Sequence, residues 1–296
     1  MFIDIHVHTT SMPSINIPGS EQTLATPEQL IEMYDTVGIE RAVLLPNANP
    51  EGIWCVQSNE EILAIAERYP DRFIPFCNID PRLWTNNPDE DLSYYMRWYR
   101  DHGCRGIGEV CCNLYWDDPR VENLFKHAEA LDMPICFHVA TREGRTYGLI
   151  DDFGLPRFEE AIRKFPDLVW LCHSQAWWSH ISGDVNVDNW GTYPKGRVTT
   201  GGRVVELMRK YPTVIGDLSA GSGFNAVSRD PEFGHWFLNE FQDQLCFGTD
   251  ICSPRGRDSV LINLANFMKQ ALAEGNISQE VFDKIARQNA RRILKL

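Results

Sequence analysis

Two histidines stand one residue apart in the apolar run FIDIHVH, at residues 2–8. Side chains alternate between the faces of a strand, so we expect His6 and His8 on one face, with Asp4 one step deeper beside them. The intervening apolar residues would then face covering helices. A lone histidine in a strand is more often a hydrogen-bonded core residue than a metal ligand. Two imidazoles on one face, however, match the donors that a divalent metal ion takes.

Four more side chains of metal-ligating type end other apolar runs. They are Glu109 in GIGEV, His138 in PICFHVA, His173 in LVWLCHS and Asp250 in LCFGTD. If these runs are neighbouring parallel strands, their carboxyl ends meet at one rim, and all six side chains converge there. Imidazoles and carboxylates form the ligand set of zinc and related ions. Leaving six such groups buried without partners would be costly, which favours a metal site over a purely structural role.

The rest of the chain provides the elements that such a rim requires. Amphipathic helical patterns separate eight apolar runs, at residues 2–8, 40–46, 72–79, 104–110, 134–140, 168–174, 213–219 and 245–250. Strand–helix alternation of this length predicts an α/β fold, a (β/α)₈ TIM barrel forming a single domain over residues 1–296. A doubly wound open sheet is the alternative.

Two predicted connections are longer than usual, residues 80–92 after the third strand and 175–200 after the sixth. Both leave the rim end of the barrel, where long loops act as lids or substrate walls, or else pack on their own aromatic residues.

Local signals predict several helix ends. Thr26 and Pro27 favour a helix start, and Gly38 favours the end of the same helix. A cation, an aromatic residue and a proline occur together in Arg68-Tyr69-Pro70, Lys164-Phe165-Pro166 and Lys210-Tyr211-Pro212. A cation suits a helix C-terminus and proline stops a helix, so each tripeptide predicts a helix that ends just before a strand.

Composition narrows the classes of function. The chain has 296 residues, 43% of them hydrophobic, and a formal net charge of -13, which argues against a nucleic acid or an anionic membrane as partner. The nine cysteines form no Cys-x-x-Cys pair, and several lie in apolar runs, as expected of reduced cysteine in a cytoplasmic protein. No signal peptide or membrane-spanning run is evident. We expect a small-molecule substrate and allow for a homodimer.

Five of the six rim residues resemble the ligand set of the amidohydrolase superfamily, whose barrels carry His-x-His on strand 1, one His on each of strands 5 and 6, and Asp on strand 8. The five are His6, His8, His138, His173 and Asp250. Within it, FGTDICSP and LVWLCHS look most like the amidohydrolase-2 group, which contains hydrolases, lactonases and non-oxidative decarboxylases of the aminocarboxymuconate-semialdehyde type. The resemblance implies one or two divalent ions, with zinc favoured over manganese. A single ion would be held by four residues, which are His6, His8, His138 and Asp250.

The resemblance leaves separate roles for two other residues. His173 would polarise a substrate carbonyl, or would be a further ligand if two ions bind. Glu109 matches the strand-4 glutamate of TatD-type nucleases only in part, because Val110-Cys111-Cys112 follows it. If two ions bind, Glu109 would bridge them. If one ion binds, Glu109 would be a ligand or would support the ligands.

The resemblance implies a metal-dependent hydrolase of a small, carboxylated or cyclic amide, ester or lactone, in which Asp250 is the general base toward metal-activated water. The alternative is a decarboxylase of a small aromatic or muconate-like acid, in which Asp250 protonates the substrate carbon. A TatD-type nuclease is disfavoured by the net charge of -13, and a non-catalytic barrel by the intact Asp250. Arginines pair with carboxylates and aromatic rings with cyclic substrates. The candidate substrate contacts are Arg142, Arg145, Trp177 and Arg255.

Overall fold

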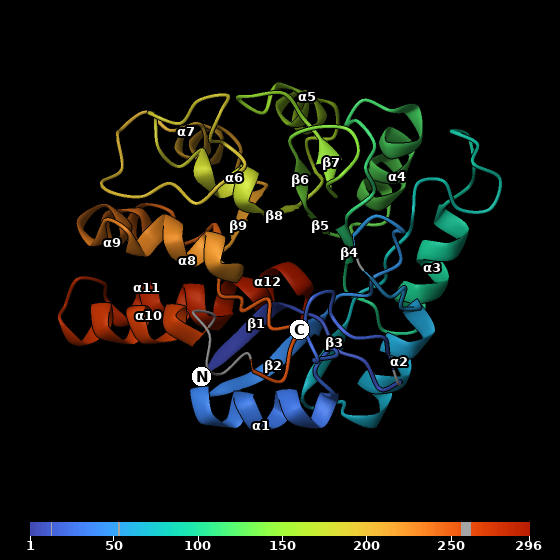
Figure 1. The fold of residues 1–296 in the computed structure, drawn as a ribbon, viewed down its shortest axis with the longest axis horizontal. Coiled ribbons are helices and arrows are strands. Elements are labelled where there is room, and N and C mark those ends of the chain that lie inside the picture. The colour runs from blue at the N-terminus through green and yellow to red at the C-terminus, as the bar shows by residue number, and fades with distance from the viewer. Residues whose placement is uncertain (13, 53, 256–261) are drawn as a thin grey trace.

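Parallel strands form the centre of the molecule in the computed structural model, which describes residues 1–12, 14–52, 54–255 and 262–296 (Figure 1). Within these ranges each of the eight apolar runs contains a strand. These strands are β1 (Phe2–Val7), β2 (Ile39–Leu44), β3 (Phe73–Pro75), β4 (Ile107–Val110), β5 (Ile135–Phe137), β8 (Trp170–Cys172), β9 (Val214–Asp217) and β10 (Leu245–Cys246).

The strands close into a barrel. β1, β2 and β3 pair in that order, and β10, β9, β8, β5 and β4 form a second parallel array. A bridge between Val7 and Ile251 joins the two arrays on one side, and a bridge between Cys77 and Ile107 joins them on the other. The sheet therefore closes on itself, and the fold is the predicted TIM barrel rather than an open doubly wound sheet.

Helices surround the strands on the outside (Figure 1). They are α1 (Pro27–Val37), α2 (Asn59–Arg68), α3 (Ser93–Asp101), α4 (Pro119–Ala130), α5 (Pro156–Lys164), α7 (Arg203–Lys210), α8 (Ala220–Ser228), α9 (Pro231–Glu240), α10 (Asn263–Ala273), α11 (Gln279–Asp283) and α12 (Asn289–Leu294). A π-helical turn over Lys284–Gln288 joins α11 to α12. No helix in the described part of the chain is long and apolar enough to cross a bilayer.

The connections at the rim differ in content. Residues 80–92 form turns without a helix or strand, whereas the segment 175–200 begins with the short helix α6 (Gln175–Ser179). The connection after β5 holds an additional parallel pair, β6 (Val139–Ala140) and β7 (Leu149–Ile150), which the sequence patterns did not predict because each strand has only two residues.

The predicted helix ends are confirmed. Thr26 caps α1 in a reciprocal bond with Gln29, and Gly38 ends it in the left-handed region at φ 89°. The helices α2, α5 and α7 end at Tyr69, Phe165 and Tyr211, the aromatic residues of the three tripeptides. Each of these residues still donates its backbone N–H to the carbonyl four residues earlier, and the proline that follows stops the helix.

A buried carboxylate joins two of these helices. Glu159 of α5 accepts hydrogen bonds from Lys210 Nζ at 2.7 Å and from the Tyr211 hydroxyl at 2.8 Å, and it also pairs with Arg203. Burial alone would raise the pKa of Glu159, but these donors outweigh it and lower the pKa from 4.5 to about 2. The carboxylate form of Glu159 is thus a stabilising link between α5 and α7.

Replacing Glu159 by glutamine should lower the free energy of unfolding by about 1–3 kcal/mol at neutral pH, because several charged donors lose their acceptor. Since the folded-state pKa is depressed, this contribution is complete above pH 4.5 and is lost as the pH falls toward about 2. Urea unfolding at several pH values measures it. Glu160→Gln is the matched control, because Glu160 is exposed and forms an ion pair with Arg163 on its own helix. Equal losses in both variants would contradict the proposed link.

Candidate metal centre

A bulge in β1 decides which side chains of this strand enter the barrel. The pairing register of β1 with β2 shifts between Asp4 and Val7, so the simple alternation of faces is broken there. Ile3 and Ile5 lie in a small apolar cluster with one or two residues from six other barrel strands, and the His6 ring also faces inward, 3.7 Å from Cys136 of that cluster. Bulges re-aim side chains in this way beside active sites.

Because of the bulge, two predictions made from the alternation of side chains along β1 are wrong. The apolar residues Ile3 and Ile5 face the barrel interior rather than the helices. Asp4 faces outward, where its carboxylate accepts hydrogen bonds from the Tyr34 hydroxyl at 3.0 Å and the Thr249 backbone at 2.9 Å. Asp4 also accepts the backbone N–H of His6 at 3.0 Å, so it supports the chain at His6 without contacting the ring.

The two imidazoles of β1 converge on two carboxylates. His6 Nε2 lies 3.7 Å from Glu109 Oε2 and 3.8 Å from Asp250 Oδ1. His8 Nε2 lies 3.7 Å from the same two oxygens. Glu109 ends β4 and Asp250 follows β10, so three separate strands bring these four groups together.

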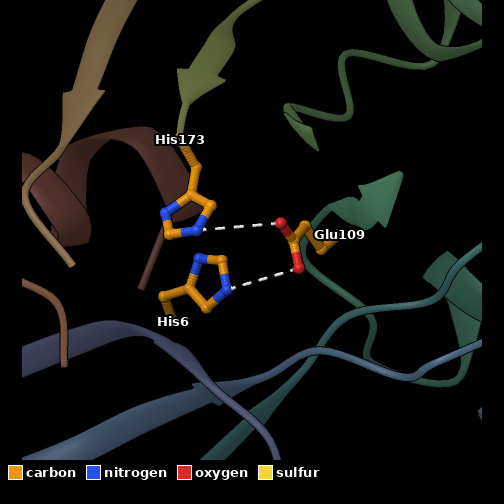
Figure 2. Close-up of side chains that lie close together, drawn as sticks. All are labelled: His6, Glu109 and His173. Carbon is orange, nitrogen blue, oxygen red and sulfur yellow. Dashed lines mark ion pairs between the residues drawn. The ribbon is translucent and has the colours of Figure 1, made fainter. Parts of the chain in front are cut away.

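Glu109 also links the other two histidines to this cluster. Its second oxygen, Oε1, accepts a hydrogen bond from His138 Nδ1 at 2.9 Å and lies 3.8 Å from His173 Nε2. Figure 2 shows His6 and His173 pointing toward opposite oxygens of the Glu109 carboxylate. His173 Nε2 is 4.0 Å from Asp250 Oδ2. The structure therefore brings all six residues of the expected ligand set together, and it pairs His138 with Glu109.

Three of the imidazoles are held from behind through Nδ1. His6 Nδ1 donates to Asp217 Oδ2 at 2.7 Å, and His8 Nδ1 donates to the Leu45 carbonyl at 3.0 Å. His173 Nδ1 shares a hydrogen bond of 2.9 Å with the Ser219 hydroxyl. Such contacts fix the ring orientation of metal-binding histidines.

Asp217 is a site residue that the sequence analysis missed. It ends β9, in the predicted strand TVIGDLS, so it meets the same criterion that selected Glu109 and Asp250. Strict alternation along β1 places the nearer Asp4, not Asp217, beside the histidines. The bulge, which the hydrophobic pattern does not reveal, leaves Asp4 facing outward, and Asp217 is the carboxylate that contacts the His6 ring.

The electrostatics of the cluster favour a bound cation. Burial opposes charge on Glu109, but contacts with His138, His6 and His8 outweigh it and hold the pKa of Glu109 well below its ordinary range. Burial also opposes charge on His6, yet the Asp217 carboxylate raises the pKa of His6. The pKa of Asp217 is lowered in turn, despite its burial, by His6 and His173. Ionised carboxylates therefore surround the imidazole nitrogens at neutral pH.

The donor set fits a divalent metal ion. His6 Nε2 is buried and has no hydrogen-bond partner among the described residues, although buried polar atoms normally have one. Ligand atoms about 2.0–2.2 Å from a shared ion lie roughly 3–4 Å apart, as the donors of His6, His8, Glu109 and Asp250 do. His6, Cys136 and Asp217 also lie close together, but the hydrogen bond of 2.7 Å between His6 and Asp217 occupies that side of the ring.

A cavity of about 620 Å³ lies on the far side of Tyr147 from the cluster. Tyr147 lines the cavity and packs on the His138 ring, with the ring centroids 4.3 Å apart, and none of the six expected ligand residues lines the cavity. The other lining residues are Glu51, Asn113, Glu143, Gly144, Arg145 and Thr146.

The four candidate substrate contacts have different surroundings in the structure. Arg145 lines the cavity. Arg142 lies close to Arg145 in the chain, and its backbone carbonyl accepts a hydrogen bond of 3.2 Å from Asn113. Arg255 is exposed. Trp177 is fully buried in the core and packs edge-on against Phe158, so its surroundings are those of a packing residue rather than of a pocket wall.

The Amidohydrolase family model matches residues 3–296, nearly the whole chain. The chain belongs to the amidohydrolase-2 family. A search among curated proteins finds no match. The structural neighbours of the chain include a probable hydrolase and several decarboxylases.

Solved structures similar to this amidohydrolase share its barrel. An uncharacterised TIM-barrel protein from Bordetella bronchiseptica has 17% identity and a TM-score of 0.67, with 99% of this chain and 98% of that chain covered. A probable 2-pyrone-4,6-dicarboxylic acid hydrolase from Acinetobacter baumannii has 12% identity and a TM-score of 0.61, with 100% and 99% covered. A 5-carboxyvanillate decarboxylase from Novosphingobium aromaticivorans, complexed with manganese and a nitrobenzoic acid, has 17% identity and a TM-score of 0.57, with 90% and 80% covered. Decarboxylases of 2,6-dihydroxybenzoate also match.

We expect a His6→Asn variant to lose affinity for the metal ion. Loss of a group that only supports a ligand weakens metal binding about 10- to 100-fold. Because His6 would be a ligand itself, its removal should weaken Zn²⁺ or Mn²⁺ binding by more than this. Equilibrium dialysis with metal analysis measures the affinity. His180→Asn is the control, because His180 is also buried but bonds to the Ala176 carbonyl; equal metal affinity in wild type and His6→Asn would contradict the site.

Proposed function

We propose that this amidohydrolase is a metal-dependent, non-oxidative decarboxylase of a small hydroxylated aromatic acid. The observation that carries the proposal is the approach of His6 and His8 Nε2 to Glu109 and Asp250 at 3.7–3.8 Å, with His6 Nε2 buried and otherwise unpartnered. These residues would hold the ion, with His138 and His173 beside them. A divalent ion bound there supplies Lewis acidity toward the oxygen atoms of a substrate.

Asp250 is the residue best placed to carry a proton. Its side chain is 27% exposed, against 8% for Glu109, so it is the carboxylate of the cluster that a substrate reaches most readily. In decarboxylation the bond between the ring carbon and the carboxylate breaks, the electron pair stays on the ring carbon, and carbon dioxide leaves. Asp250, protonated beforehand from solvent, gives this proton to that carbon and is left as a carboxylate. His173, 4.0 Å from Asp250 Oδ2, is positioned to return a proton to Asp250 after small movements.

Two considerations support decarboxylation over hydrolysis, which the sequence alone placed first. Decarboxylases of 2,6-dihydroxybenzoate and 5-carboxyvanillate recur among the similar structures, and one of them was solved with manganese and an aromatic acid. Arg145 and Tyr147 also line the nearby cavity, and an arginine and an aromatic ring suit a carboxylated ring.

Hydrolysis of a cyclic ester is the second candidate. The same Asp250 carboxylate is placed to take a proton from an attacking water, and a probable 2-pyrone-4,6-dicarboxylic acid hydrolase shares the fold over the whole chain. His173 would then polarise the carbonyl that is attacked.

A small substrate panel distinguishes the two reactions. The Zn²⁺- and Mn²⁺-loaded enzyme is given 2,6-dihydroxybenzoate, 5-carboxyvanillate and 2-pyrone-4,6-dicarboxylate, with carbon dioxide release and lactone opening followed separately. We expect carbon dioxide from an aromatic acid. Lactone opening without carbon dioxide would replace the first proposal by the second, and the absence of both reactions would count against each.

Asp250→Asn should lower turnover by about 10²- to 10⁴-fold on whichever substrate is accepted, because the proton carrier is lost. The assay is run at saturating metal, since Asp250 is also near the ion, and the metal content of the variant is measured in parallel. Asp152→Asn is the control, because Asp152 is exposed and pairs with Arg157 away from the cluster. A metal-loaded Asp250→Asn enzyme with full turnover would contradict the role of Asp250.

A further inference from the structure

The carboxylate of Asp217 is fixed in place behind the His6 ring. Both side chains are fully buried, and the Asp217 Oδ2 to His6 Nδ1 distance is 2.7 Å. The other oxygen, Oδ1, accepts the Ser219 backbone N–H at 3.0 Å, and the Asp217 carbonyl accepts the indole N–H of Trp178 at 2.9 Å. Asp217 is therefore anchored independently of His6.

A glycine makes room for this carboxylate. A Cβ atom at position 248 would lie 2.7 Å from Asp217 Oδ1 and 2.7 Å from the Ser219 Cβ, closer than real side chains approach. Gly248 thus lets the segment after β10 pass directly over Asp217. The position of the carboxylate depends on the absence of a side chain at residue 248.

The contact selects one form of the His6 ring. An ionised carboxylate only accepts hydrogen bonds, so the proton of a neutral His6 must be on Nδ1. The lone pair is then on Nε2, the buried atom without a hydrogen-bond partner that lies 3.7 Å from Glu109 and 3.8 Å from Asp250. Asp217 also approaches His173 Nδ1, but at the longer distance of 3.5 Å, and His173 has its own partner in Ser219.

We infer that Asp217 is a positioning residue that holds His6 with Nε2 toward the ion. This inference rests on the proposed metal site and adds to it a residue that touches neither the substrate nor the ion. The effect is specific to Asp217. Asp4 is equally buried, but it bonds to the backbone of His6 and not to its ring.

The test compares Asp217→Asn with Asp151→Asn. The two variants make the same chemical change in two buried carboxylates, but Asp151 accepts backbone N–H groups at the start of α5 and does not contact His6 in the described structure. Mn²⁺ binding is measured by equilibrium dialysis at pH 8. We expect affinity to fall about 10- to 100-fold in Asp217→Asn and to stay near the wild-type value in Asp151→Asn. Gly248→Ala should lower the affinity as well, because it displaces the Asp217 carboxylate.

A second measurement needs no variant at Asp217. ¹⁵N-histidine NMR of the Zn²⁺-loaded wild-type protein, with His6 assigned by its loss in His6→Asn, should show His6 protonated at Nδ1 and bound through Nε2. Binding through Nδ1 would overturn the inference, and so would unchanged Mn²⁺ affinity in a folded Asp217→Asn. A wild-type protein that binds neither ion would instead contradict the proposed metal site itself.

Discussion

The buried hydrogen bond between His6 and Asp217 is the interaction on which the mouth of this barrel depends. It joins the first strand to β9 across the barrel interior, between two side chains that are wholly removed from solvent. An ionisable pair in such a place is tolerated only when both members are compensated. Asp217 is compensated by Ser219 and His6, and His6 retains one buried nitrogen without a partner. That remaining atom is the reason to infer an ion.

Two of the other imidazoles are also held by a hydrogen bond through Nδ1. His8 is held by the Leu45 carbonyl of the segment after β2, and His173 by Ser219 after β9. His138 differs, because its Nδ1 donates to Glu109 and so orients a carboxylate. Among the described residues, seven of the eight barrel strands, all but β3, thus lead to either a donor group or a contact that holds the side chain of one. Rings fixed in this way lose little conformational freedom when they bind a ligand.

Much of this arrangement follows from the sequence, because the carboxyl ends of alternating strands must share one rim. That rule was sufficient to place Glu109, His138, His173 and Asp250 beside the histidines of β1. The alternation of side chains along β1 gave the wrong face for Asp4 relative to the histidines, because the bulge changes the face of each following residue and apolar periodicity does not record a single extra residue. Trp177 shows a second limit, since the sequence does not tell a ring in the core from a ring at a rim.

One ion and one mobile proton at this site would serve both candidate reactions. Both reactions depend on an ion that, as we infer, is held by Nε2 of His6 and His8 together with Glu109 and Asp250. Anomalous diffraction from crystals grown with Zn²⁺ tests this inference directly. We expect a peak about 2.0–2.2 Å from both Nε2 atoms, and a peak on the Cys136 side of His6, or none among these four residues, would contradict the account.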